Sequence, residues 1–166
     1  MDYLWTPWRY AYVSSATVVA RTDACLFCGI AEDQSHDDEN LVVLRAEKNF
    51  LVLNRYPYNS GHLMIVPYEH VATLGGAATD TLEEMMRLGQ RAENALRQVY
   101  RPEGFNLGLN IGQSAGAGVA AHIHMHALPR WAGDTSFMTT VGETRVLPED
   151  LRTTRERLQK EFAKSA

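Results

Sequence analysis

The stretch His122-Ile123-His124-Met125-His126-Ala127-Leu128-Pro129 places three histidines on alternate residues. Successive side chains of a β-strand point to opposite faces of its sheet, so this spacing predicts a strand with the three imidazoles in one row. Ile123, Met125 and Ala127 would then face a core. Pro129 has no N–H to donate to a neighbouring strand, so the paired part of the strand should end near it.

Two chemistries suit a row of histidines that follows the small-residue loop 112–118. Alternating histidines are most often metal ligands or a chance pattern, and imidazole is the commonest transition-metal ligand in proteins. The glycines of the loop allow backbone N–H groups to approach an anion closely, which favours chemistry on a phosphate. The row and the loop by themselves leave both interpretations open.

Length and composition indicate one ordinary globular domain. The chain has 166 residues, of which 45% are hydrophobic and 22% charged, and this suits a single core. The net charge of −4 argues against a broad nucleic-acid-binding surface. No apolar run approaches the roughly 20 residues that a membrane-spanning helix needs, and residues 1–13 do not resemble a signal peptide. We therefore expect a cytoplasmic protein with neither a nucleic acid polymer nor a membrane as a partner.

The remaining pattern predicts an α+β domain, with an antiparallel sheet of about five strands, one long helix and a C-terminal helix. Short, alternating apolar runs predict the strands, and apolar residues at helical spacing predict the helices. We expect one domain over 1–166 with an aromatic arm at 1–21, strands at 41–45, 50–53, 62–67, 105–110 and 122–128, a short helix at 70–74, a long helix at 80–100 and a charged, surface-lying helix within the extension 148–166.

The long helix has a predicted start and a predicted buried face. Asp80-Thr81-Leu82-Glu83 resembles a capping box that opens the helix. We assign both Met85 and Met86 to core packing rather than to a functional methionine surface.

The chain has two cysteines, Cys25 and Cys28, at C-x-x-C spacing. In a chain without a secretion signal this spacing indicates a metal or redox site rather than a structural disulfide. Two cysteines provide half of a tetrahedral zinc site, so two histidines must complete it, and His70 and His122 are the candidates. The alternative is a pair of small core thiols without a metal.

Taken together, these motifs resemble those of the histidine triad (HIT) family of nucleotide hydrolases and transferases. The family signature is His-x-His-x-His followed by two apolar residues, as at His122 to Leu128. The resemblance covers 25 to 131 and includes Cys25-Leu-Phe-Cys28, Asn54-Arg-Tyr-Pro57, Ser60-Gly-His62-Leu-Met-Ile-Val-Pro67 and His70. Leu4-Trp-Thr-Pro-Trp-Arg9, Pro129-Arg-Trp131 and Gly133-Asp-Thr135 are similar to the branch associated with diadenosine tetraphosphate phosphorylase.

The resemblance implies a fold and residue roles. His124 matches the nucleophile that attacks the α-phosphorus and becomes a nucleotidyl-histidine. His126 and Gln113 match groups near the phosphate and the leaving oxygen, while His62 matches a histidine behind the triad, which either contacts phosphate or is structural. The implied nucleotide contacts are Phe27, Ile30, Leu53, Asn54, Asn110, Gln113, Gly116, Ala117, Gly118, His124 and His126. For Phe27, Ile30 and Leu53 the alternative is an ordinary place in the core. A structural zinc would be bound by Cys25, Cys28, His70 and His122.

The resemblance also implies an activity and an assembly. We expect cleavage of the α–β phosphoanhydride of dinucleoside polyphosphates such as diadenosine tetraphosphate, with phosphate or water as acceptor. The alternatives are a nucleoside phosphoramidate hydrolase and a zinc-stabilised nucleotide-binding module without turnover. A homodimer or higher homo-oligomer is expected through the helix 80–100 and the strand 105–110, and Trp5 and Trp8 on the arm favour an interface as well.

One position departs from the family pattern. Many members carry Ser or Thr shortly before the triad, where this chain has Ala117-Gly118-Val119. A hydroxyl contact to phosphate would then have to come from Ser114, or be replaced by a backbone N–H.

Overall fold

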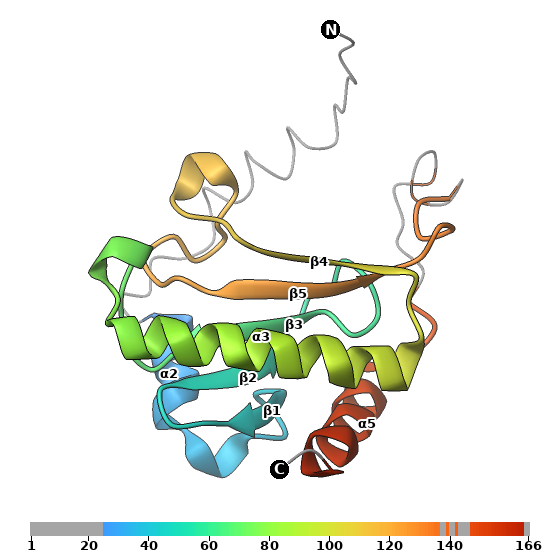
Figure 1. The fold of residues 1–166 in the computed structure, drawn as a ribbon, viewed down its shortest axis with the longest axis horizontal. Helices are drawn as coiled ribbons and strands as arrows, with labels where there is room; N and C mark the ends of the chain where they lie inside the picture. The colour runs from blue at the N-terminus through green and yellow to red at the C-terminus, as the bar shows by residue number, and fades with distance from the viewer. Residues whose placement is uncertain (1–24, 137–138, 140–141, 143–146, 165–166) are drawn as a thin grey trace, which may run out of the picture.

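In this computed structural model the described residues are 25–136, 139, 142 and 147–164. Five strands form one antiparallel sheet, as expected (Figure 1). The strands are β1 (Val42–Arg45), β2 (Asn49–Leu53), β3 (Leu63–Pro67), β4 (Gly104–Leu109) and β5 (Met125–Arg130), in the spatial order β1-β2-β3-β5-β4. Strand β5, which follows two of the histidines and contains the third, therefore lies between β3 and β4. The predicted arm at 1–21 lies outside the described residues.

The two faces of the sheet carry two separate apolar clusters. Helices α3 (Thr79–Tyr100) and α5 (Leu151–Lys164) cover one face, packing on the side chains that include Leu51, Leu53 and Ile65. The short helix α2 (Leu26–Glu32) lies on the other face, where Phe27 packs among Val42, Phe50, Val52, Met64 and Val66. The alternation along β2 and β3 separates the two sets, as the period of a strand requires.

Side chains of the histidine stretch alternate between the two faces of the sheet, although the regular strand begins only at Met125. Paired β5 starts at Met125, so His122 and His124 precede it, and it ends at Arg130, one residue after Pro129. Ile123, Met125 and Ala127 lie in the cluster beneath α3, as predicted. The imidazoles consequently face the side of α2.

The predicted short helix at 70–74 is wrong. The backbone N–H of Ile123 donates to the carbonyl oxygen of Val71 at 2.7 Å, so this segment pairs with the chain next to the triad instead of coiling. A single 3-10 turn, η2 (Leu74–Gly76), follows it.

Two predictions about the long helix are also wrong. Helix α3 begins at Thr79 after Ala78, which provides no side-chain cap, and Asp80 lies in the first turn instead of capping it. Its carboxylate still interacts favourably with the positive end of the helix dipole. Met85 is buried, but Met86, a further 100° around the helix, is 65% exposed in the single chain.

The C-terminal helix α5 does not lie on the surface as predicted. Leu158 and Phe162 are buried in the cluster beneath α3, and the Arg155 guanidinium donates to the carbonyl oxygen of Val42 at 2.6 Å. Because α5 is rich in charged residues, its sequence provided little indication that its few apolar side chains are buried. These side chains complete the core at the β1 edge of the sheet. No helix in the described ranges is long and apolar enough to cross a membrane.

Candidate active site and metal centre

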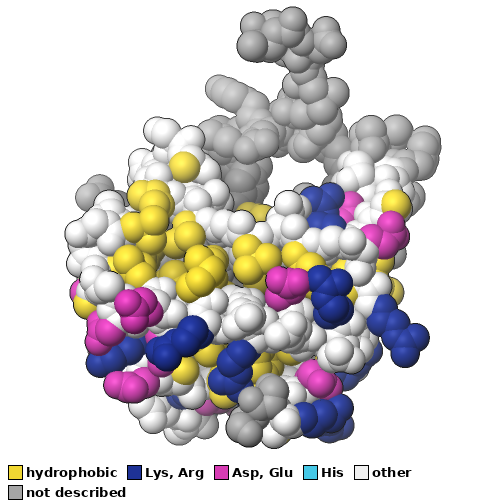
Figure 2. All heavy atoms as spheres, in the orientation of Figure 1, with side chains coloured by type: hydrophobic (Ala, Val, Ile, Leu, Met, Phe, Trp, Pro, Cys, Tyr) yellow, Lys and Arg dark blue, Asp and Glu magenta, His cyan; other side chains and the backbone are white. Residues whose placement is uncertain are grey.

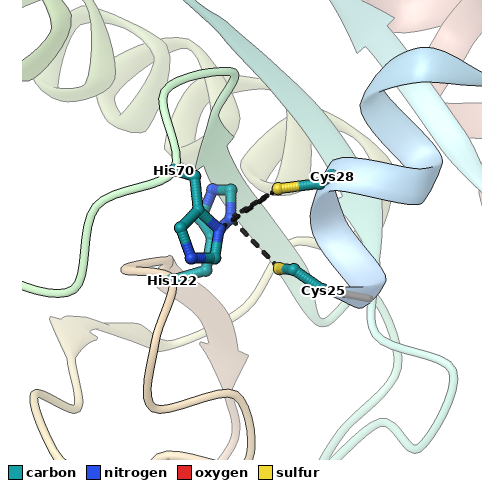
Figure 3. Close-up of side chains that lie close together, drawn as sticks. All are labelled: Cys25, Cys28, His70 and His122. Atoms are coloured by element: carbon teal, nitrogen blue, oxygen red, sulfur yellow. Dashed lines mark hydrogen bonds between the residues drawn. The ribbon is translucent and has the colours of Figure 1, made fainter. Parts of the chain in front are cut away.

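Four potential metal ligands meet where α2, the segment after β3 and the histidine stretch converge (Figure 3). The Sγ atom of Cys25 lies 3.3 Å from Nδ1 of His122, and Sγ of Cys28 lies 3.2 Å from Nδ1 of His70. One ligand atom from each of the four residues lies within 4.8 Å of the other three. The structure thus brings together all four residues that were expected to bind zinc.

The distances between the ligand atoms suit a zinc ion with tetrahedral coordination. With Zn–S and Zn–N bonds of about 2.3 and 2.0–2.1 Å, neighbouring ligand atoms of a tetrahedron lie roughly 3.3–3.8 Å apart. The Sγ of Cys28 is 3.7 Å from Nδ1 of His122, which is within that range. The other ring nitrogen of His122 donates to the carbonyl oxygen of Pro67 at 2.9 Å, so Nδ1 carries the lone pair that faces the cluster. A second partner of this kind is usual for a metal-bound histidine.

His124 is oriented by its own backbone. Its Nδ1 lies 2.9 Å from the carbonyl oxygen of His122, and because a carbonyl can only accept, Nδ1 carries the hydrogen. The neutral ring therefore has its lone pair on Nε2. The ring is 96% buried and its centroid lies 4.9 Å from that of Phe27, so its rotation is restricted.

A chain of hydrogen bonds also sets the tautomers of His62 and His126. The backbone N–H of Tyr58 donates to Nδ1 of His62 at 3.2 Å, so the hydrogen of neutral His62 is on Nε2. That Nε2 lies 2.8 Å from Nδ1 of His126 and donates to it. The hydrogen of neutral His126 is consequently on Nε2, where it can be donated to an oxygen of a ligand. Sequence reasoning left His62 undecided, and this contact makes it the partner that orients His126.

Burial keeps the imidazoles of His124 and His126 neutral. It lowers the pKa of His124, although the hydrogen bond to the His122 carbonyl opposes the shift. Burial, and then the nearby His124, lower the pKa of His126 to about 4. Near pH 7, His124 therefore presents a lone pair and His126 a neutral N–H donor.

The face of the sheet that carries His124 also carries a group of apolar side chains, which we call the apolar wall, with the polar Asn54 at one end. Phe27 and Ile30 of α2 pack in the same cluster as Val52, and half-buried Asn54 follows two residues later on the same face. The side-chain oxygen of Asn54 accepts the backbone N–H of Tyr56 at 2.9 Å. The expectation for Leu53 is not met: its side chain packs in the cluster beneath α3, on the opposite face of the sheet, whereas that of Val52 packs on the face of α2.

The small-residue loop lies directly before the histidines. Gln113 starts the exposed 3-10 turn η3 (Gln113–Ala115), and Asn110 follows β4 at its end. Gly112 and Gly116 have φ values of +82° and +88°, which favour glycine at these two turns. The N–H groups of Gly116 and Ala117 donate to the carbonyl oxygens of Gln113 and Gly112, at 2.9 and 3.4 Å, and so are used within the loop itself. Gly118 lies exposed at the end of the loop.

Two residues that the sequence analysis passed over support this site. The Arg45 guanidinium donates to the carbonyl oxygens of Ile30 and Ala31, at 2.8 and 3.2 Å, and so anchors the end of α2, the helix that carries Phe27. The Tyr58 ring lies 4.7 Å from that of His62. A charged residue ending an apolar strand was the available signal for Arg45, while nothing local distinguished Tyr58 from other loop tyrosines.

Comparison with known proteins agrees with this geometry. Residues 35–133 match the model of the HIT domain, and the chain belongs to the histidine triad family. It is 43% identical over 169 residues to AP-4-A phosphorylase of Mycobacterium tuberculosis, with 99% of this chain and 86% of that protein aligned.

Solved structures of the same family have the same fold. A Zn-bound histidine triad family protein from Mycobacterium smegmatis superposes with a TM-score of 0.70 at 28% identity, covering 86% of this chain and 96% of that one. A histidine triad nucleotide-binding protein from Sulfolobus tokodaii gives 0.69 at 27% identity, covering 84% and 93% of the two chains.

Proposed function

We propose that this protein is an enzyme that cleaves the α–β phosphoanhydride of dinucleoside polyphosphates, with diadenosine tetraphosphate as the leading substrate. The observation that carries the proposal is the fixed tautomer of His124, whose Nε2 lone pair lies beside an apolar wall suited to a nucleoside. The near full-length similarity to AP-4-A phosphorylase supports the choice of substrate.

The reaction proceeds in two displacements. Nε2 of His124 attacks the α-phosphorus, forming an N–P bond while the P–O bond to the β-phosphate breaks and a nucleoside polyphosphate departs. An oxygen of inorganic phosphate, or of water, then attacks the same phosphorus and releases the histidine. Splitting the transfer in this way replaces one difficult displacement by two easier ones.

The other histidines and the loop stabilise the negative charge that develops on the phosphate and leaving oxygens during the reaction. The Nε2–H of His126 donates to the oxygen that leaves, and His62 holds His126 in the tautomer that can do so. Gln113, Asn110 and the N–H group of Gly118 contact the phosphate oxygens, where preorganised donors have their largest effect. Phe27, Ile30, Val52 and Asn54 bind the first nucleoside.

We assign a structural zinc ion to Cys25, Cys28, His70 and His122. The donor set and its near-tetrahedral spacing support zinc, as does the Zn-bound relative. The ion would join α2 and the segment after β3 to the triad, which keeps Phe27 against His124. Cysteine thiolates persist in a reducing compartment, so we propose that the protein is located in the cytoplasm.

A homodimer through α3 and β4 completes the proposal. Figure 2 shows hydrophobic side chains gathered on the face where Figure 1 draws these two elements. The exposed side chains there include Met86 at 65% and Leu107 at 40%. Contiguous exposed apolar surface of this kind marks an interaction site, and symmetric dimers are the commonest assembly.

The decisive assay supplies diadenosine tetraphosphate with and without phosphate. ADP plus ATP identifies a phosphorylase, and AMP plus ATP a hydrolase. His124→Ala should abolish turnover while nucleotide binding persists, and His36→Ala, an exposed histidine outside the site, should behave like the wild type. Turnover of the His124→Ala protein near the wild-type rate would refute the mechanism. Cleavage of a nucleoside phosphoramidate alone would indicate the hydrolase alternative, and binding without turnover the non-catalytic module.

A further inference from the structure

A cavity of about 270 Å³ lies beyond the histidine row, at the end of β5 that is remote from α2. Its lining includes Tyr58, Asn59, Asn106, Leu128, Arg130 and Asp134. Of these, Tyr58 also contacts the triad, since its ring centroid lies 6.1 Å from that of His126 and stacks on it. The cavity therefore borders the histidine row at Tyr58 and is used by none of the roles assigned above.

The strand geometry connects the cavity to the reacting centre. Leu128 and Arg130 continue the alternation of His124 and His126, so all four side chains lie on one face of the sheet. At about 3.3 Å per residue, Leu128 lies roughly 13 Å and Arg130 roughly 20 Å along the chain from His124. On β4, Asn106 lies opposite Leu128, and Gly108 opposite His126. No atom of the described residues lies within 4 Å of the place where a Cβ on Gly108 would be, so nothing in that part of the chain covers the sheet surface beside His126 at this position.

The charges of the cavity are paired with each other. The Arg130 guanidinium donates to both carboxylate oxygens of Asp134, and its Nη1 donates to the side-chain oxygen of Asn106 at 2.6 Å. Asn59 also donates to Asp134, at 2.9 Å. Because Asp134 neutralises Arg130, the described lining is poorly suited to a phosphate group. It suits an uncharged, planar group that can pack on Tyr58 and Leu128 and form hydrogen bonds at its edge.

We propose that this cavity binds the nucleoside of the departing nucleotide. This inference rests on the proposed function, in which the leaving group is itself a nucleoside polyphosphate. The first nucleoside lies against α2, and in-line displacement sends the leaving oxygen away from the attacking nitrogen, on the side of His126. The polyphosphate then follows the open surface beside Gly108, and its terminal nucleoside reaches the cavity with its base against Tyr58.

The test compares two substrates that share the reacting adenylyl group; where one has a free terminal phosphate, the other has the second nucleoside. Diadenosine tetraphosphate carries it, and adenosine 5′-tetraphosphate lacks it. For the wild type, kcat/KM should be about tenfold higher for the dinucleotide, the size expected for one base stacked on an aromatic ring. Asn106→Trp and Thr135→Trp, both at exposed positions on the cavity lining, should fill the space and bring that ratio close to one. Arg152→Trp, exposed on α5, is the matched control and should keep the wild-type ratio.

The possible results distinguish a failure of the nucleoside site from a failure of the proposed function. A ratio near ten that both cavity variants abolish supports the nucleoside site, provided that circular dichroism shows them folded. A wild-type ratio near one, or a ratio that both variants leave unchanged, overturns the nucleoside site while leaving the proposed function intact. A wild type that consumes neither substrate refutes the proposed function itself.

Discussion

Replacing Gly61 by alanine should destabilise the protein and displace the histidine that follows it. Gly61 has a φ of +78°, and a Cβ at this position would lie 2.9 Å from Cδ2 of Leu96 and 2.9 Å from Cε2 of Tyr100. Neither neighbour can move easily. Leu96 is completely buried, and the Tyr100 hydroxyl is held by hydrogen bonds to Glu149 and Thr154.

The magnitude follows from three contributions. A left-handed conformation costs a non-glycine residue about 1–2 kcal/mol, and overpacking against rigid neighbours costs about 1–3 kcal/mol. The smaller entropy of the unfolded alanine chain offsets about 0.4–1 kcal/mol of this. We therefore expect a loss of about 3 kcal/mol in the free energy of unfolding, and a decrease of about 6–12 °C in Tm for a domain of this size.

Urea unfolding followed by circular dichroism measures this loss. Gly104→Ala is the matched control, because no atom of the described residues lies within 4 Å of its added Cβ and its φ lies outside the left-handed region. The control should stay within about 0.5 kcal/mol of the wild type. If Gly61→Ala matches the control, the argument from backbone strain and close packing is refuted. The variant should also turn over more slowly, because His62 orients His126.

Three further predictions concern the metal, the pH dependence of stability and the assembly. Protein purified without added metal should contain about one zinc per chain by elemental analysis, and Cys28→Ser should lose it; a fully active, metal-free wild type would contradict this. Burial raises the pKa of Glu149, but hydrogen bonds led by that from Tyr100 outweigh burial and lower it below its ordinary range. This carboxylate therefore stabilises the fold above its unfolded pKa of about 4.3, and the contribution disappears as pH falls through the lower folded value. Urea unfolding at pH 7 and pH 3 should show Glu149→Gln less stable than the wild type at pH 7 alone, and an equal deficit at both values would refute the linkage. Light scattering should give the wild type a mass well above the 18.6 kDa of one chain, with Met86→Arg shifted toward that mass; a monomeric wild type would count against the dimer.

The general architecture and the cluster of potential metal ligands followed from local sequence patterns. The strand periods, the alternating histidines and the C-x-x-C pair are short-range patterns, and each predicted an element or a cluster that the structure contains. Local patterns are informative here because a strand with one face buried and a chelating pair both impose constraints over a few residues.

Only the tertiary structure decided which face each side chain meets. Leu53 was expected at the nucleotide and packs beneath α3, since a shift of one residue in a strand moves a side chain to the opposite face. Met86 was expected in the core and is exposed, and α5 was expected on the surface and closes the core. The hydrogen bond between His62 and His126 joins residues 64 positions apart. It exists because the chain crosses from β3 to β4 through α3 and then returns in β5, which pairs with β3. That strand order depends on the packing of the whole domain, and no local pattern in the sequence specifies it.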